Sequence, residues 1–342
     1  MGCGAQSAPH AAWPSTKLPG ALTQIAPNDP NISYSDCAHV EVTGERARFD
    51  RVLEANGGMK WDAPGARIRF QTDAPRVAAR LFFNGLHTDT QDSSGVGAWF
   101  VDGRLAGSWG QNAAPNSELS VALQQQEKPV SHLYEVVLPY GQSVDFRGLS
   151  LEGATLLQSA PPRPKIRFIA YGDSITHGFW ASDPTKTYPF LVGQKNGWEV
   201  ENMGFGGRPT TPDDASTIAA LRPDVVSVLM GYNDQFHRTP DEYGAQLKAT
   251  LQALRAGLPH TPIYVLTLLW SSNPYPTKYS LPIEDYRKAA RAAFAQVKDA
   301  NFHLVEGETL IPGNAKFFRE GIHPTDEGFA LMAQQLAPQL KP

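Results

Sequence analysis

The chain has 342 residues, of which 41% are hydrophobic and 19% are charged, and its 30 basic and 34 acidic side chains give a formal charge of −4. This is an ordinary globular composition, so a fibrous or largely disordered chain is excluded, and the length predicts more than one domain. No basic cluster stands out in the sequence, and a nucleic-acid partner is therefore not expected.

Residues 1–36 are interpreted as an N-terminal tail. Their start, Met1-Gly2-Cys3-Gly4, resembles the mature start of a bacterial lipoprotein, which predicts a lipid anchor through Cys3 and a periplasmic or secreted location. An unpaired tail cysteine, a bridge between Cys3 and Cys37, and a cytoplasmic location stay open. The longest apolar runs, such as residues 225–230, are far shorter than the roughly 20 residues that span a bilayer, so no membrane span is predicted.

Residues 37–160 have the two-residue period of half-buried β-strands. Ile68, Phe70 and Thr72 alternate with polar neighbours, and turn signals such as Asn84-Gly85 and Asp102-Gly103 recur too closely for a long helix to fit between them. Short strands joined by such turns predict an antiparallel β-sandwich.

The pattern changes after the proline-rich stretch of residues 160–164, which predicts a short, stiff spacer. Beyond it, apolar strand candidates alternate with amphipathic segments whose leucines recur at helical spacing. This alternation predicts a second domain over residues 161–342, an α/β fold with a parallel sheet covered by helices on both faces. Such folds hold their functional groups in loops at the carboxyl ends of the strands. The strand candidates are residues 168–171, 225–230, 263–269 and 302–305.

Two motifs follow the first strands of this second domain. Ser174, in Gly172-Asp173-Ser174, falls at a strand-to-helix turn, where a serine has the exposed hydroxyl that a nucleophile requires; the plainer role is a helix N-cap. The glycine-rich stretch that ends in Gly207 lets backbone N–H groups approach an anion closely, although it could also be an ordinary loop. A dinucleotide loop is excluded, because Pro209 occupies the position of its last glycine.

Two further motifs complete the set. Asn233 follows the next strand candidate, and its amide is a neutral donor suited to a developing oxyanion, or else a turn residue. His323 precedes the last helix, with Glu320 three residues upstream, which supplies the base and the orienting carboxylate that a serine nucleophile needs. A structural histidine is the alternative.

Together, these residues resemble the four blocks of the SGNH hydrolase (GDSL esterase) superfamily, over the chain from about residue 165 onward. The resemblance implies a three-layer α/β/α domain with Ser174 as nucleophile and His323 as general base. It also implies an oxyanion hole formed by the N–H groups of Ser174 and Gly207 with the Asn233 side chain. The family's usual acid is an aspartate where this chain has Glu320, so both a triad with Glu320 and a Ser–His pair stay open.

The first domain resembles, more loosely, the jelly roll that precedes the SGNH domain in carbohydrate esterase family 2, in its segments 61–65 and 100–103. This implies a serine esterase that hydrolyses short-chain acyl esters, above all acetyl esters of carbohydrate. Similar sandwiches precede SGNH acyltransferases, so transfer of the acyl group to a hydroxyl acceptor is the alternative. A non-catalytic sugar-binding protein with surface aromatics at Trp99 and Trp109 would not explain why all four blocks are intact.

The remaining expectations concern ligands. No metal or cofactor is implied, because the nine histidines form no HExxH-like pair and no phosphate-binding loop is present. The oligomeric state and the particular ester stay open. Five residues of the loops after the strands are expected to line the acyl and acceptor pockets, with ordinary loop packing as the alternative: Phe236, His237, Trp270, Tyr275 and Tyr279.

Overall fold

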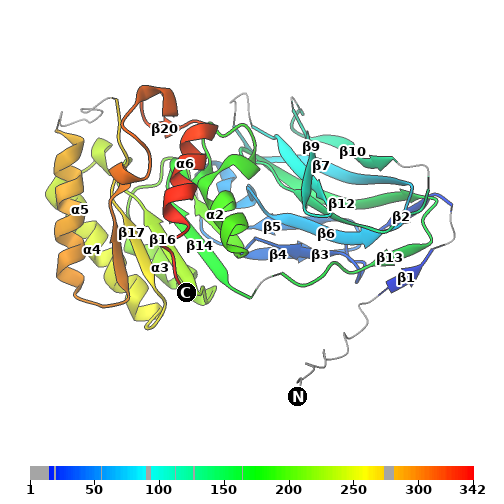
Figure 1. The fold of residues 1–342 in the computed structure, drawn as a ribbon, viewed down its shortest axis with the longest axis horizontal. Helices are drawn as coiled ribbons and strands as arrows, with labels where there is room; N and C mark the ends of the chain where they lie inside the picture. Colours follow the sequence, from blue (N-terminus) through cyan, green and yellow to red (C-terminus); the bar gives the residue numbers. More distant parts are fainter. Residues whose placement is uncertain are drawn as a thin grey trace, which may run out of the picture.

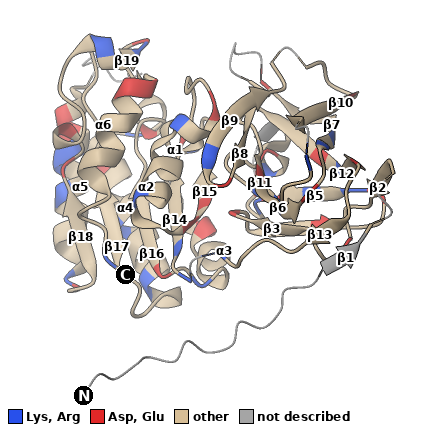
Figure 2. Ribbon diagram, turned by 45° about the vertical axis from the view of Figure 1, so that its right-hand side comes forward, with Lys and Arg blue, Asp and Glu red and all other residues tan. Residues whose placement is uncertain are grey.

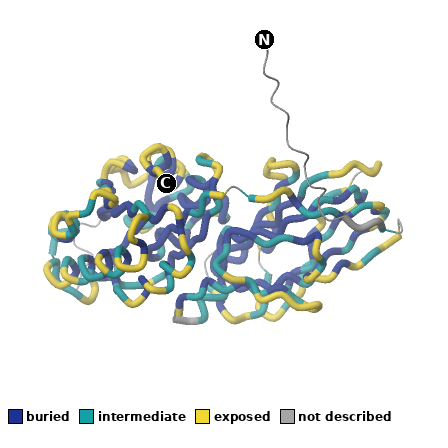
Figure 3. The backbone as a smooth tube through the Cα atoms, turned by 90° about the horizontal axis from the view of Figure 1, so that it is seen from below, coloured by how far each residue is buried: buried dark blue, intermediate teal, exposed yellow. Residues whose placement is uncertain are grey.

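The computed structural model describes residues 15–342 apart from 19–20, 55, 90–93, 112, 126–127, 164 and 273–280. It contains an antiparallel β-sandwich followed by a parallel α/β domain, and the two lie side by side (Figure 1). Each domain has its own buried core (Figure 3). Charged residues of both signs are spread over both domains (Figure 2). Among the described residues, no helix combines the length and the apolar character needed to cross a membrane.

The β-sandwich consists of two antiparallel sheets whose inner faces share one core. Phe70 and Tyr134 of one sheet and Phe83 and Phe146 of the other are fully buried in it. The first sheet has the order β1 (Ser15–Lys17), β13 (Leu156–Gln158), β6 (Arg67–Thr72), β11 (His132–Val137), β8 (Gly97–Val101) and β9 (Arg104–Trp109), with β3 (Ser33–Ser35) also paired to β6. The second has the order β10 (Ser117–Gln125), β7 (Arg76–Thr88), β12 (Gln142–Glu152), β5 (Ala47–Asp50) and β4 (His39–Val42), with β2 (Thr23–Ile25) also paired to β12.

The structure of this domain differs from two expectations drawn from the sequence. From residue 15 on, the segment expected to be a tail contributes the short strands β1, β2 and β3 to the two sheets. Trp109 is not a surface aromatic, because it is 5% exposed and its indole Nε1 donates to the Ala98 carbonyl at 3.1 Å. Cys37 is a free thiol, whereas Cys3 lies outside the described residues.

The second domain contains the predicted parallel sheet. Its strands are β15 (Glu199–Gly204), β14 (Arg167–Gly172), β16 (Val225–Leu229), β17 (Ile263–Leu266) and β18 (Phe302–Val305), in that spatial order. Helices α2 (Tyr188–Asn196) and α6 (Asp326–Leu336) pack against each other on one face, and α3 (Ala215–Ala220), α4 (Pro240–Gly257) and α5 (Ile283–Val297) cover the other (Figure 1). Shorter elements are α1 (Ser174–His177), the hairpin of β19 (Phe318–Arg319) and β20 (His323–Pro324), and the 3-10 turns η1 (Asn56–Trp61), η2 (Pro184–Lys186), η3 (Pro212–Asp214), η4 (Asp234–Phe236), η5 (Gly307–Thr309) and η6 (Ala315–Phe317).

The strand order determines where a functional site can form. Numbered along the chain, the five strands lie in the spatial order 2-1-3-4-5. The chain passes from β14 to β15 on one side of it and then crosses back to β16 on its other side. In such sheets a crevice opens at the carboxyl ends of the strands where the order reverses. That crevice lies between the ends of β14 and β16, which are followed by Ser174 and Asn233.

Candidate active site

Ser174 begins α1 directly after β14. Gly172 permits the tight turn, because a Cβ there would lie 2.0 Å from Thr176 Oγ1 and 2.7 Å from the Leu229 carbonyl oxygen. The N-cap of α1 is Asp173, whose Oδ1 accepts the Ile175 N–H at 3.0 Å. The capping role that the sequence left open for the serine therefore belongs to its neighbour, and the Ser174 hydroxyl is available for other partners.

The structure brings Ser174, His323 and Glu320 together although 149 positions separate the serine from the histidine. Ser174 Oγ lies 2.9 Å from His323 Nε2, and His323 Nδ1 lies 3.0 Å from Glu320 Oε2. Burial lowers the pKa of His323, and this effect outweighs the opposing influence of Glu320. The imidazole is thus neutral at neutral pH, and its unprotonated Nε2 can accept the serine proton.

Glu320 reaches the histidine because of an unusual turn. Glu320 and Gly321 link β19 to β20 with φ values of 53° and 78°, and this left-handed turn folds the glutamate back toward His323. The turn is supported from the neighbouring strand-end loop, where Ser271 Oγ donates to the Gly321 carbonyl at 2.8 Å.

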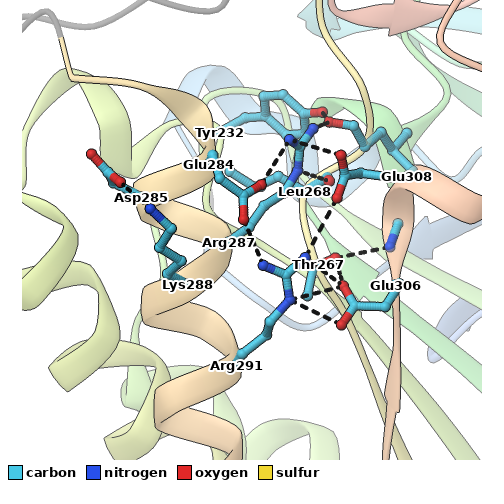
Figure 4. A network of polar contacts seen from close by, with 12 residues as sticks. Tyr232, Thr267, Leu268, Glu284, Asp285, Arg287, Lys288, Arg291, Glu306 and Glu308 are labelled. Atoms are coloured by element: carbon cyan, nitrogen blue, oxygen red, sulfur yellow. Dashed lines mark hydrogen bonds and ion pairs between the residues drawn. The ribbon is translucent and has the colours of Figure 1, made fainter.

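That loop is itself anchored by α5. Arg287 is 5% exposed, and its guanidinium donates to the Leu268 and Leu269 carbonyls at 2.8 and 2.5 Å (Figure 4). Arg287 also forms ion pairs with Glu284 and Glu308 in the network drawn there. The backbone between β17 and Ser271 is therefore fixed to α5 by these hydrogen bonds.

Two aromatic residues beside the triad were not predicted from the sequence. The Trp180 indole Nε1 donates to the second oxygen of Glu320, Oε1, at 2.6 Å. The Phe179 ring centroid lies 4.5 Å from that of His323. Trp180 has φ 70°, a left-handed conformation that no sequence pattern predicts for a bulky residue. The available signal was an aromatic pair shortly after the serine, and it is a weak one.

The glycine loop, defined here as residues 204–208, lies beside Ser174 at the end of β15. The Phe205 N–H donates to the Gly172 carbonyl at 3.0 Å, which ties the loop to the turn before the serine. Gly207 has φ 74° with open space around its Cβ position, so the backbone conformation and not crowding calls for glycine. Asn233, after β16, donates through Nδ2 to the Arg208 carbonyl at 3.2 Å. The structure thus gathers all the residues of the four blocks at one crevice.

The five residues expected to line the pockets differ from one another in their surroundings. Phe236 is 45% exposed and His237 is also exposed, both in or next to η4, close in sequence to Asn233. Trp270 is half-buried and packs its ring on Phe318 at 5.2 Å, which is the ordinary loop packing considered as its alternative. Tyr275 and Tyr279 lie outside the described residues.

A groove of about 660 Å³ lies beside the triad between the two domains. It is lined in part by Trp180, whose indole donates to Glu320. Its walls carry both hydrogen-bond donors and hydrogen-bond acceptors. Val96, Ser108 and Gln111 come from the sandwich, and Trp180, Ser182, Asp183, Lys316, Arg319, Thr325, Asp326 and Glu327 come from the α/β domain.

Among the described residues, no group of three or more His, Cys, Asp or Glu side chains is arranged to hold a metal ion. A buried acid next to the serine has another role. Asp173 is fully buried, and burial raises its pKa to about 7. Its Oδ1 accepts the Ile175 N–H, so Asp173 serves as the N-cap of α1.

Comparisons with known proteins identify the family of the α/β domain and structures with a similar fold. Residues 170–331 match the model of the GDSL-like Lipase/Acylhydrolase family. Similar solved structures include a salicylyl-acyltransferase, SsfX3, from a tetracycline biosynthetic pathway (22% identity, TM-score 0.79, covering 92% of this chain and 95% of that one). They also include a family two carbohydrate esterase from Cellvibrio japonicus, with 16% identity and a TM-score of 0.68, covering 95% of this chain and 97% of that one. An acetyl xylan esterase from the rumen bacterium Butyrivibrio proteoclasticus matches with 13% identity and a TM-score of 0.67, covering 94% of this chain and 98% of that one.

At these identities the structural matches concern the fold, and they extend over both domains. A sequence search among curated proteins found no match. The resemblance to the SGNH superfamily and to the two-domain architecture of carbohydrate esterase family 2 is confirmed. Residues 170–331 of this chain therefore form a GDSL-like lipase/acylhydrolase (SGNH) domain, which follows an antiparallel β-sandwich domain.

Proposed function

We propose that this protein is a serine esterase that removes short acyl groups, acetyl above all, from hydroxylated carbohydrate-type molecules. The observation that carries the proposal is the continuous hydrogen-bond chain from Ser174 Oγ through His323 to Glu320, at 2.9 and 3.0 Å. A neutral imidazole between a serine and a carboxylate is the arrangement that activates a hydroxyl for attack on an ester. The family match supports chemistry on acyl groups.

The proposed reaction proceeds in two halves. Ser174 Oγ attacks the ester carbonyl while His323 Nε2 takes the serine proton, and the carbonyl oxygen becomes an oxyanion. The N–H groups of Ser174 and Gly207 and the Asn233 amide stabilise that oxyanion. The carbon–oxygen bond to the alcohol then breaks, and the alcohol leaves with the proton from His323.

The second half regenerates the enzyme. His323 takes a proton from water, and the resulting hydroxide equivalent attacks the acyl carbon. The bond to Ser174 breaks, the proton returns to the serine oxygen, and the carboxylic acid departs. Throughout, Glu320 accepts the Nδ1–H of His323, which fixes the tautomer and stabilises the imidazolium in each transition state.

The groove between the domains supports a large hydroxylated leaving group. The alcohol departs on the histidine side of the serine, because His323 protonates it, and Trp180 connects that side to the groove. The groove volume of about 660 Å³ and its polar walls suit sugar hydroxyls. Two solved relatives named as a carbohydrate esterase and an acetyl xylan esterase share the two-domain fold, which favours acetylated carbohydrate as the substrate class.

An acyltransferase is the second candidate, since the solved salicylyl-acyltransferase has the same two-domain fold with a TM-score of 0.79. The two functions differ only in whether water or another hydroxyl attacks the acyl-enzyme. Added alcohols distinguish them: in a transferase they convert most of the consumed ester to new ester, whereas in an esterase free acid remains the main product.

The test is a panel of p-nitrophenyl esters from acetyl to octanoyl, followed by acetylated xylan and mannan, with the Ser174→Ala variant alongside. We expect the fastest turnover with acetyl, release of acetate from the polysaccharides, and complete loss of both turnover and fluorophosphonate labelling in Ser174→Ala. Wild-type turnover in Ser174→Ala would rule out Ser174 as the nucleophile. Normal labelling of the wild-type protein without any hydrolysis would favour the transferase.

A further inference from the structure

The glycine loop is held by side chains of the sandwich as well as by its own domain. Arg51 follows β5, is 2% exposed and points across the domain boundary. Its Nη1 donates to the Gly204 carbonyl at 2.5 Å, and its Nη2 donates to the Met59 carbonyl at 2.6 Å. One guanidinium thus joins a carbonyl of the sandwich domain to the carbonyl at which the glycine loop begins.

Further contacts link the rest of the glycine loop to Arg51 itself and to two residues that follow it, Glu54 and Met59. The Arg51 guanidinium carbon lies 4.0 Å from the centroid of the Phe205 ring. The Met59 side chain lies next to Gly206, since its Sδ is 3.8 Å from the Cβ position of that glycine. At the end of the loop, Arg208 Nη1 donates to the Glu54 carbonyl at 2.8 Å.

The backbone fixes the direction in which Arg51 points. Val52 has φ 58°, a left-handed conformation that β-branched residues rarely adopt. It is held by its N–H, which donates to Asp50 Oδ1 at 2.7 Å, and by the Leu53 N–H, which donates to the Arg51 carbonyl at 2.8 Å. Leu53 is 3% exposed and belongs to the core of the α/β domain, so the turn is anchored in the other domain.

We propose that Arg51, a residue of the sandwich, is a positioning residue for the oxyanion hole of the α/β domain. This inference rests on the proposed function. Oxyanion donors act only when they lie about 2.7–3.1 Å from the developing charge, so a small shift of Gly207 lowers turnover. Arg51 does not touch the reacting atoms. It fixes Gly204, three residues before Gly207, through a planar fork that bonds two carbonyls at once, which a lysine ammonium reproduces poorly.

The experiment compares full-length Arg51→Met and Arg51→Lys with the wild-type protein on p-nitrophenyl acetate. The concentration of active sites is taken from the end point of fluorophosphonate labelling, so misfolded molecules are not counted. We expect kcat per active site to fall about 10- to 100-fold in Arg51→Met with KM within about twofold, and to fall less in Arg51→Lys. A phenylboronic acid, which forms a tetrahedral serine adduct, should bind more weakly in the same order.

Arg48→Met is the matched control. Arg48 forms a two-pronged ion pair with the buried Asp145 at 2.9 Å, inside the sandwich and away from the glycine loop. Its loss should lower thermal stability while kcat per active site stays at the wild-type value. Equal kcat in Arg51→Met and Arg48→Met would overturn the inference. If Arg51→Met does not fold, wild-type kcat and boronate affinity in Arg51→Lys would overturn it instead. Neither result bears on the esterase mechanism, which the Ser174→Ala variant tests separately.

Discussion

At the scale of single residues, Glu320 shows how a longer acid can occupy the position of an aspartate. The left-handed turn at Glu320 and Gly321 draws the carboxylate back, so the additional methylene does not carry it past His323. Its two oxygens have different partners, His323 Nδ1 on one and the Trp180 indole on the other. These contacts are the ones that a Ser174–His323–Glu320 triad requires, so we propose the triad rather than the Ser–His pair.

Glu320→Gln should therefore lower kcat by roughly 10²- to 10⁴-fold, because the amide cannot stabilise the imidazolium as the carboxylate does. Loss of the anion also favours neutral imidazole, so the pKa of His323 falls further and the acidic limb of the pH–rate profile moves to lower pH. Steady-state kinetics from pH 4 to 9 checks both effects. More than half of wild-type turnover with an unshifted profile would leave only the Ser174–His323 pair. Glu320→Asp tests reach separately from charge.

Trp180→Phe tests the support behind the acid. Phenylalanine keeps an aromatic ring beside Phe179 and Arg319 but removes the indole donor to Glu320 Oε1. Because the Glu320 side chain is 48% exposed, solvent replaces part of that bond, and we expect a loss of only about 2- to 10-fold in kcat. In a Glu320→Gln background the same substitution should have almost no further effect, as measured by a double-mutant cycle. Independent, additive losses would show that Trp180 acts through something other than the glutamate.

At the scale of elements, regular patterns were predictable and irregular ones were not. Continuously apolar strands predicted the parallel sheet, and leucine spacing predicted the helix now seen as α4. Strands β1, β2 and β3 were missed because three residues are too few to display a period of two. The residues of the four motifs were identified from the sequence because the spacing of those motifs is characteristic of the family. Arg51 and Trp180 were not, since their roles depend on left-handed backbone at Val52 and Trp180 itself, a tertiary constraint without a sequence pattern.

Helix α1 illustrates another interaction that the sequence did not reveal. His177, at its C-terminal end, is fully buried, and its Nε2 lies 2.9 Å from Asp62 Oδ2 of the sandwich. Asp62 Oδ2 also lies 3.1 Å from His87 Nδ1, and Arg51 Nη2 lies 3.3 Å from His177 Nε2. Burial first, and then Arg51, lower the pKa of His177 to about 4, although Asp62 opposes them. The helix that carries the candidate nucleophile is therefore docked through a neutral histidine.

This docking predicts a defined dependence of stability on pH. With a folded pKa of about 4 and an unfolded pKa near 6.5, His177 binds a proton only in the unfolded state between those values. The free energy of unfolding should thus fall on acidification from pH 6.5 to 4.5, by at most about 1.4 kcal/mol per pH unit from this group. Asp173, whose pKa is raised to about 7, acts in the opposite direction, so the comparison is made with His177→Gln.

The measurement is urea unfolding at several pH values in that range. The wild-type protein should lose more stability per pH unit than His177→Gln, whatever their absolute stabilities. Equal slopes would mean that His177 is protonated in the fold, paired with Asp62 as a charged group.

At the scale of the whole molecule, the two domains have separate cores but are packed tightly against each other. Leu53 of the sandwich segment lies in the core of the α/β domain, and Phe190 of α2 packs with Phe100 of β8 at a ring distance of 6.1 Å. The linker is held on both sides, since Arg163 Nη2 donates to Asp36 Oδ1 at 2.9 Å and to the Trp198 carbonyl at 3.2 Å. These contacts resemble those within one domain more than those of a flexible pair.

The last prediction follows from this packing. A chain that begins at Lys165 lacks the sandwich, so it exposes Phe190 and His177 and leaves the Gly204 carbonyl without the Arg51 guanidinium. Newly exposed apolar surface favours aggregation, and an unsupported glycine loop misplaces Gly207. We expect the shortened chain to be insoluble, or soluble with kcat on p-nitrophenyl acetate reduced at least about 10-fold, because the defect lies in the oxyanion hole and not only in the acceptor groove. Soluble yield, thermal unfolding and activity on p-nitrophenyl acetate and acetylated xylan measure this. Loss on xylan alone would limit the sandwich to the groove, and full activity on both substrates would show that the α/β domain needs no partner.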